Sequence, residues 1–110
     1  MSPAAIGAAF CAALVSGDPS AITPLLTPDL AERTTAPDIG WHSGDVAPLA
    51  CMPVGATGTA EHPESVLFLT FPGGGTASDR LVLSFIDSQL FIDDVAYAGG
   101  GTLRETLAAP

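Results

Sequence analysis

Basic residues are scarce in this chain of 110 residues. Lysine is absent, and only Arg33, Arg80 and Arg104 oppose twelve Asp and Glu residues, which leaves a net charge of −9 at pH 7. A nucleic-acid site needs a clustered basic surface to neutralise phosphates, so nucleic acid is excluded as a partner. An acidic surface repels anionic lipid and attracts basic proteins or cations. Solubility alone would also account for the charge, and that interpretation stays open.

Long apolar runs are also lacking. The run from Ala4 to Val15 is too short to span a bilayer and follows no cationic segment, so we expect neither a signal peptide nor membrane insertion. Ser2 and Pro3 favour a helix start and Gly17 a helix end. The apolar residues share one face of the predicted helix, made by Ile6, Phe10, Ala13 and Leu14. Because the chain begins inside a helix start, one hypothesis is that Met1 replaces a removed leader; a native start at Met1 is the alternative, and the sequence leaves the two open.

Cysteine occurs only at Cys11 and Cys51, a spacing that matches no metal or redox motif. In an exported protein a disulfide between them would tie helix to sheet and, in the entropic interpretation, stabilise by about 4 kcal/mol. Cys11 also fits an ordinary buried residue on its helix. The sequence leaves the pairing open.

Proline after a capping residue recurs at Asp18-Pro19, Thr23-Pro24 and Thr27-Pro28. This pattern predicts two or three brief helical turns, which place the apolar residues Ile22, Leu25, Leu26 and Leu30 toward the core. Residues 34–59 then form a Pro- and Gly-rich segment without periodicity. We predict an irregular excursion over these residues, with at most short strands. The role of the longer segment 34–64 is open.

Three β-prone runs at 65–71, 80–86 and 90–95 predict an antiparallel meander. Residues 72–79 are expected to form a long hairpin loop that includes Asp79, and Asp87-Ser88-Gln89 a tight one. Both faces of the middle run are apolar, which favours a strand covered on both sides by the helices and by the excursion or a partner. Thr102 opens a capping box for a short terminal helix. We therefore predict one α+β domain over residues 1–110, with helices packed on an antiparallel sheet.

Both ends of the chain carry a resemblance. The segments that carry it are Ser2 to Ile6 with Phe10, Leu25 to Leu30, Phe91 to Val95 with Tyr97, and Leu103-Arg104. They resemble a bacterial exported family of unknown function with a cystatin-like fold, whose last strand reads Trp-x-Ile-Asp-Asp-x-x-Tyr; here Phe91 is the aromatic, one place later. The resemblance implies a helix in a curved sheet of the nuclear-transport-factor-like type and a periplasmic or lipoprotein location. It brings no catalytic residues.

Metal binding is a weak candidate function. His42 and Asp45 are three residues apart, and His62 lies between Glu61 and Glu64. Their nitrogen and oxygen atoms could ligate a metal, and Cys51 with Met52 would suit copper. Nothing in the spacing is specific, so we predict no metal site and no cofactor. Neither glycine cluster has the pattern of a phosphate loop.

Two functions from different classes remain. Asp93 and Asp94 would point to opposite faces of a strand, and one of them could be a buried general base in an isomerase- or hydrolase-like enzyme. The structural alternative, in which one is solvated and the other caps a turn or pairs with Arg80 or Arg104, is favoured because no second polar partner is evident.

The favoured function is a non-enzymatic binding module, periplasmic or secreted, with the cytoplasm as the alternative. It would recognise a basic protein or a small apolar ligand, as an inhibitor or immunity-type protein, and could form a homodimer. Trp41 is either a core plug or lid, or an exposed anchor for a partner. The candidate binding residues are Trp41, His42, Asp45 and Tyr97.

Overall fold

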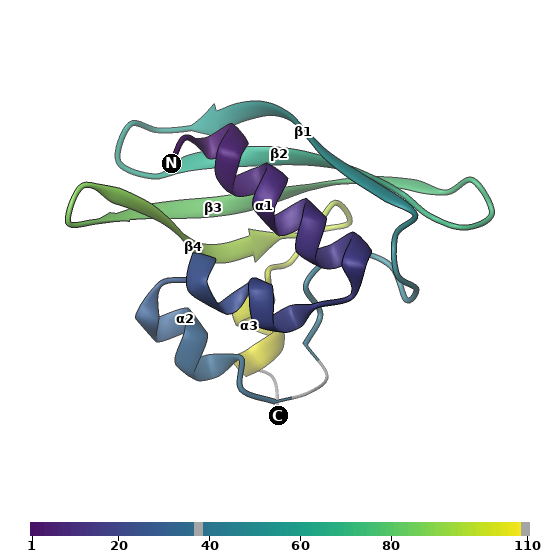
Figure 1. Cartoon of the computed structure of the whole chain (residues 1–110), viewed down its shortest axis with the longest axis horizontal. Coiled ribbons are helices and arrows are strands. Elements are labelled where there is room, and N and C mark those ends of the chain that lie inside the picture. Colours follow the sequence, from purple (N-terminus) through teal and green to yellow (C-terminus); the bar gives the residue numbers. More distant parts are fainter. Residues whose placement is uncertain (37–38, 109–110) are drawn as a thin grey trace.

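A computed structural model describes residues 1–36 and 39–108. It confirms the α+β class: α1 packs on one face of an open, four-stranded antiparallel sheet, and α2 and α3 lie beside its edge strand β4 (Figure 1). The helical elements are α1 (Pro3–Ser16), the 3₁₀ turns η1 (Pro19–Ala21) and η2 (Thr23–Leu25), α2 (Pro28–Arg33) and α3 (Leu103–Ala108). The strands are β1 (Ala50–Gly58), β2 (Pro63–Thr70), β3 (Thr76–Ile86) and β4 (Gln89–Ala96).

The helix boundaries follow local capping chemistry. Ser2 Oγ accepts a hydrogen bond from the Ala5 amide at the start of α1, and Gly17 ends the helix in a left-handed conformation. Thr27 caps α2 in the same way, and Thr102 Oγ1 accepts from the amide of Glu105 at the start of α3. These ends are where the sequence predicts them. Within the described residues no helix combines the length and apolar character needed to cross a membrane.

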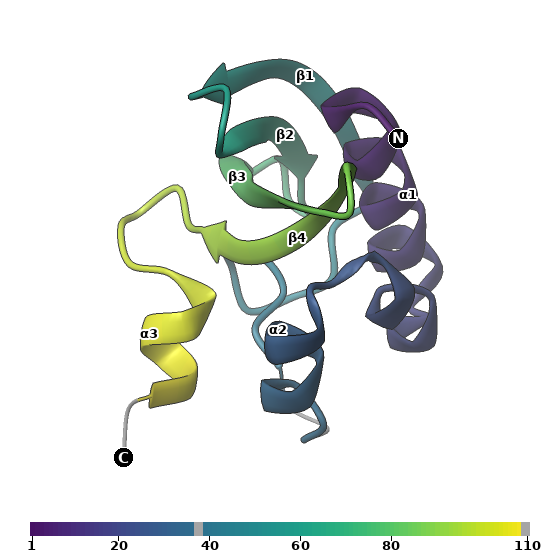
Figure 2. The ribbon, with the colours of Figure 1, turned by 90° about the vertical axis from the view of Figure 1, so that its left-hand side faces the viewer.

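The strands pair in chain order, β1-β2-β3-β4, so β1 and β4 are the two edges. Figure 2 shows the sheet curving around the side on which α1 lies. The strands bury one face against the helices, and its fully buried residues include Leu67, Leu69, Leu81, Leu83, Ile92 and Val95. In β4 the alternation is interrupted by a register shift, so Ile92 and Val95 lie three positions apart and pair with Leu83 and Leu81. They meet Ile6, Phe10 and Leu14 of α1 in a single core.

A disulfide joins Cys11 of α1 to Cys51 of β1 across 40 positions of sequence, with a Cα–Cα distance of 5.1 Å. Cys11 is also buried, so both interpretations of this residue apply. The bond fixes the helix beside the edge strand. The sequence had left this pairing open.

Two expectations about the strands are wrong. The excursion was expected to hold at most short strands, yet nine residues, Ala50–Gly58, form β1 in register with β2. The loop expected over 72–79 is shorter, because β3 begins at Thr76 and takes in Asp79. In both places pairing with a neighbouring strand outweighs local Gly and Pro content.

The sequence led us to expect that the excursion or a partner covers the second face of the sheet. Among the residues described, the excursion does not cover it. Phe68, Ser78 and Arg80 point away from the helices and are exposed. The segment before β1 instead packs on the helix side, where Trp41 reaches the core.

Candidate functional site

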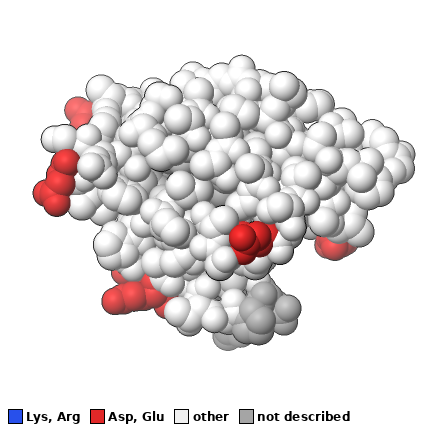
Figure 3. Space-filling view, in the orientation of Figure 1, with Lys and Arg blue, Asp and Glu red and all other residues white. Residues whose placement is uncertain are grey.

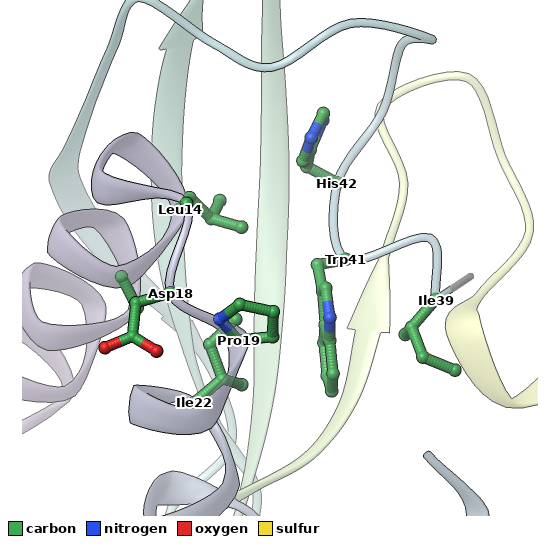
Figure 4. Close-up of a pocket in the computed structure, with 9 residues that line it drawn as sticks. Leu14, Asp18, Pro19, Ile22, Ile39, Trp41 and His42 are labelled. Atoms are coloured by element: carbon green, nitrogen blue, oxygen red, sulfur yellow. The ribbon is translucent and has the colours of Figure 1, made fainter. Parts of the chain in front are cut away.

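A narrow apolar slot lies between the end of α1 and the segment that precedes β1. It has a volume of about 170 Å³. Figure 4 shows Leu14, Pro19 and Ile22 on one side of it, and Trp41 with His42 on the other. The carboxylate of Asp18 lies at the rim and points away from the indole ring (Figure 4). The slot therefore offers an apolar interior with a negative charge at its edge.

Trp41 has a double role. Its ring packs edge-to-face on Phe10 of α1, with centroids 6.5 Å apart and planes at 74°. The same side chain lines the slot and is only partly buried. One side of the Trp41 ring thus packs into the core, as the core-plug interpretation predicts, and the other side remains available to a ligand.

Asp79 holds the segment that carries Trp41. It is 1% exposed, and its carboxylate accepts hydrogen bonds from the Ser43 amide (2.7 Å) and the Ser43 hydroxyl (2.5 Å). It also accepts one from the Ala98 amide (2.9 Å), in the turn after β4. One buried carboxylate on β3 thus clamps two loops that are far apart in sequence.

Tyr97 fixes the same segment from the other side. Its hydroxyl donates to the Gly40 carbonyl, next to Trp41. Burial raises the pKa of the Tyr97 hydroxyl above its ordinary value, and the nearby charges of Asp94 and Asp79 raise it further. Tyr97 supports the wall of the slot and does not line it.

His42 lines the slot and packs against Phe71, with ring centroids 5.9 Å apart. Its Nδ1 lies 2.6 Å from the Ser43 carbonyl, which assigns the proton to Nδ1. Asp45 is exposed on the same segment and does not line the slot. Of the four candidate binding residues, Trp41 and His42 line the slot, and His42 also lines a separate open pocket together with Tyr97.

No protein family, curated protein or solved structure matches this chain. The resemblance to the exported cystatin-like family therefore stays a prediction. The function has to be argued from the site itself.

The three arginines form salt bridges with carboxylates of the same chain. Arg33 pairs with Asp29 at 3.2 Å and Arg80 with Glu64 at 2.9 Å. Arg104 pairs with Asp29 at 2.6 Å and with Asp93 at 2.8 Å. The face drawn in Figure 3 shows acidic groups and no basic ones.

The two candidate general bases take part in structural contacts. Asp93 accepts hydrogen bonds from Thr27 Oγ1 (3.1 Å) and from Arg104 Nη2 (2.8 Å), which join β4 to α2 and α3. Asp94 accepts from the Arg104 amide (3.0 Å) at the first turn of α3. Neither carboxylate lines the slot. These contacts agree with the structural interpretation of Asp93 and Asp94. Their use as a general base stays a prediction.

The candidate metal ligands are dispersed. His42 packs beside Phe71 at one end of β2, whereas His62 precedes the other end and lies 3.4 Å from the Ser84 hydroxyl. The Cys51 sulfur is held in the disulfide and is unavailable as a thiolate. Across residues 1–36 and 39–108, no three His, Cys, Asp or Glu residues gather in a group that could hold a metal ion.

Asp79 is the site residue that the sequence interpretation missed. The signal was present: Ala77, Asp79, Leu81 and Leu83 continue a single period of two, which assigns Asp79 to the buried face. The Gly-rich stretch just before it favoured a loop instead.

Proposed function

We propose that this protein is a non-enzymatic binding module that recognises a basic protein by anchoring one partner side chain in the Trp41 slot. The observation that carries the proposal is an apolar, aromatic-walled slot in a chain whose net charge is −9. An inhibitor or immunity-type role fits such a module. The cystatin-like assignment belongs to the same proposal.

The size of the slot favours a side chain over a small-molecule ligand. Pockets for drug-sized ligands have volumes of about 300–1,000 Å³. A cavity of about 150 Å³ holds a benzene-sized group. The slot, at about 170 Å³, suits one phenylalanine, leucine or aliphatic arginine stem. Aromatic anchors seated in such pockets dominate many interfaces.

The charge distribution favours a basic partner. All three arginines are paired within the chain, so the acidic surface that remains would speed the approach of a cationic protein. Asp18, at the rim of the slot, would meet cationic groups that flank the anchor. Trp41 can add a cation–π contact with an arginine.

An extracytoplasmic location is part of the proposal. The Cys11–Cys51 disulfide is of a kind that persists in oxidising compartments such as the periplasm or the extracellular space. A basic protein encountered there is the partner that the charge would attract.

The test uses a short synthetic peptide in which arginines flank one phenylalanine. Trp41 is the only tryptophan, so its fluorescence reports occupation of the slot. We expect binding that weakens as salt rises and that is lost when glutamates replace the arginines or glycine replaces the phenylalanine. Calorimetry should show weaker binding by Trp41→Phe and Asp18→Asn.

The matched controls are Phe85→Ala, an exposed aromatic on β3, and Asp87→Asn, an exposed carboxylate in the β3–β4 turn. Both should bind as the wild type does. Equal binding of the arginine and glutamate peptides would contradict the charge argument. An unchanged affinity in Trp41→Phe would remove the slot from the proposal.

A further inference from the structure

A second surface, separate from the slot, is formed by the outer side of α1 and the edge strand β1. Helix α1 and its flanks, residues 1–17, carry no charged residue, and neither do residues 46–60, which contain β1. The exposed side of the helix is itself apolar and is made by Ala4, Ala8, Ala12 and Val15. A helix that is apolar on every side is normally buried.

A groove of about 430 Å³ runs along this surface, beside the disulfide. Its floor is made of small groups, namely Ala8, Ala12, Pro53 and the Cys11–Cys51 bridge. Its rim consists of large apolar side chains that are strongly exposed: Leu49 at 64%, Met52 at 56% and Val15 at 48%. Because the walls are so exposed, the groove is shallow and suits a protein surface better than an enclosed ligand.

We infer that this α1–β1 groove is the interface of a homodimer, with a second copy of the chain as its occupant. Two copies each carry a charge of −9 and repel one another wherever their acidic surfaces meet. Figure 3 shows that the area over α1 and β1 is free of acidic groups, which lie toward the margins and over the end of α1. Copies can therefore approach through this surface at the least electrostatic cost.

A twofold homodimer through the groove needs a self-complementary surface. A twofold axis places the same patch on both partners, so the rim of one copy must fit the floor of the other. Leu49 is the most exposed of the three rim side chains and would insert over the alanines of the partner's α1. The small floor residues permit this close approach.

The area is sufficient for a weak but specific dimer. Helix α1 has 14 residues and is about 21 Å long. Helix, groove and strand together are roughly 20 Å wide, so each copy would contribute roughly 400–500 Å². The total approaches the roughly 1,000 Å² that a specific interface needs, so the dimer would lie at the small end of the specific interfaces.

The test is sedimentation analysis of the full, oxidised chain from roughly 1 µM to roughly 500 µM. We expect a monomer–dimer equilibrium that strengthens as salt rises, because salt screens the repulsion between the acidic copies. Binding of a basic peptide at the Trp41 slot has the opposite salt dependence, so the two inferences fail independently. A monomer at every concentration would overturn the homodimer.

Two variants locate the interface. Leu49→Glu and Ala12→Glu each place a carboxylate on the groove of both copies and should raise the dissociation constant at least about 30-fold. Phe85→Glu is the matched control, since Phe85 is 51% exposed on β3, outside the groove, and receives the same charge. Far-ultraviolet circular dichroism confirms that each variant is folded. Dimerisation unchanged in both groove variants, or equally lost in Phe85→Glu, would refute the assignment.

Discussion

The clamp formed by Asp79 gives the sharpest prediction about stability. Replacing Asp79 by alanine removes the acceptor for the Ser43 amide and hydroxyl and the nearer of two acceptors for the Ala98 amide, which also donates to Ser43 Oγ at 3.2 Å. Each partly buried donor left without a partner costs about 1–3 kcal/mol. Water can reach part of this site once the side chain is gone, so we expect a total loss of about 2–4 kcal/mol. That is a large part of the 5–15 kcal/mol typical of a domain.

Asp79→Asn separates charge from shape. The amide keeps one oxygen acceptor but turns an NH₂ group toward a backbone N–H donor, so we expect a loss of about 1–2 kcal/mol. Asp45→Ala is the control, because Asp45 is exposed on the same segment and its loss should cost less than about 0.5 kcal/mol.

The assay is urea unfolding followed by Trp41 fluorescence, with the disulfide intact. Trp41 is two residues from Ser43, so the probe lies next to the clamp. The midpoint should fall by about 1–2 M in Asp79→Ala. Binding of the arginine peptide should weaken in parallel, since the clamp supports the slot wall. A midpoint equal to that of Asp45→Ala would refute the reasoning.

Three further perturbations test other parts of the fold. Hydrogen bonds from Arg104, and then from Arg33, lower the pKa of Asp29 below its ordinary value of 3.8. The ionised carboxylate therefore stabilises the fold above pH 3.8, and this contribution disappears as the pH falls through the lower pKa of the folded state. The urea midpoints of Asp29→Asn and of the wild type should differ at pH 7 and converge in acid. Because the pKa of Tyr97 is raised, its neutral hydroxyl contributes stability that is fully present below the ordinary pKa of 10.0 and is lost as the pH rises through the pKa of the folded state. An ultraviolet titration of this single tyrosine should show the raised pKa, and a midpoint at or below 10 would contradict the burial argument. Ser65→Ala should stabilise by about 1 kcal/mol in urea unfolding, because Ser65 Oγ is buried without a hydrogen-bond partner among the residues described; a loss of stability would reveal one.

The helices could be predicted because their signals are local. Ser2, Thr27 and Thr102 each satisfy an amide three residues away, and proline can begin a helix without its N–H. No distant contact is needed to place such ends. The same holds for the β3–β4 turn, where Asp87 and Ser88 adopt positive φ angles.

The first strand could not be predicted because it depends on distant partners. Pro53 and Gly55 weaken the local preference, and the register shifts between them. The strand forms because β2 pairs along it and because Cys51 is bonded to α1. Proline is tolerated there since β1 is an edge.

The site shows the same division. Trp41 and His42 could be singled out as rare residues in an irregular segment, but their enclosure by Pro19 and Ile22 is a tertiary fact. Asp79 was missed because its donors, Ser43 and Ala98, lie 36 and 19 positions away.

The position of the disulfide has a consequence for proteolysis. All residues that line the slot, from Ala13 to His42, lie between Cys11 and Cys51. One peptide-bond cut within this stretch would leave the two fragments covalently joined, with both walls of the slot still attached to the same molecule. The cut would be visible on a reducing gel and invisible on a non-reducing one. In a protease-rich environment, a nicked molecule could thus retain both halves of its binding site.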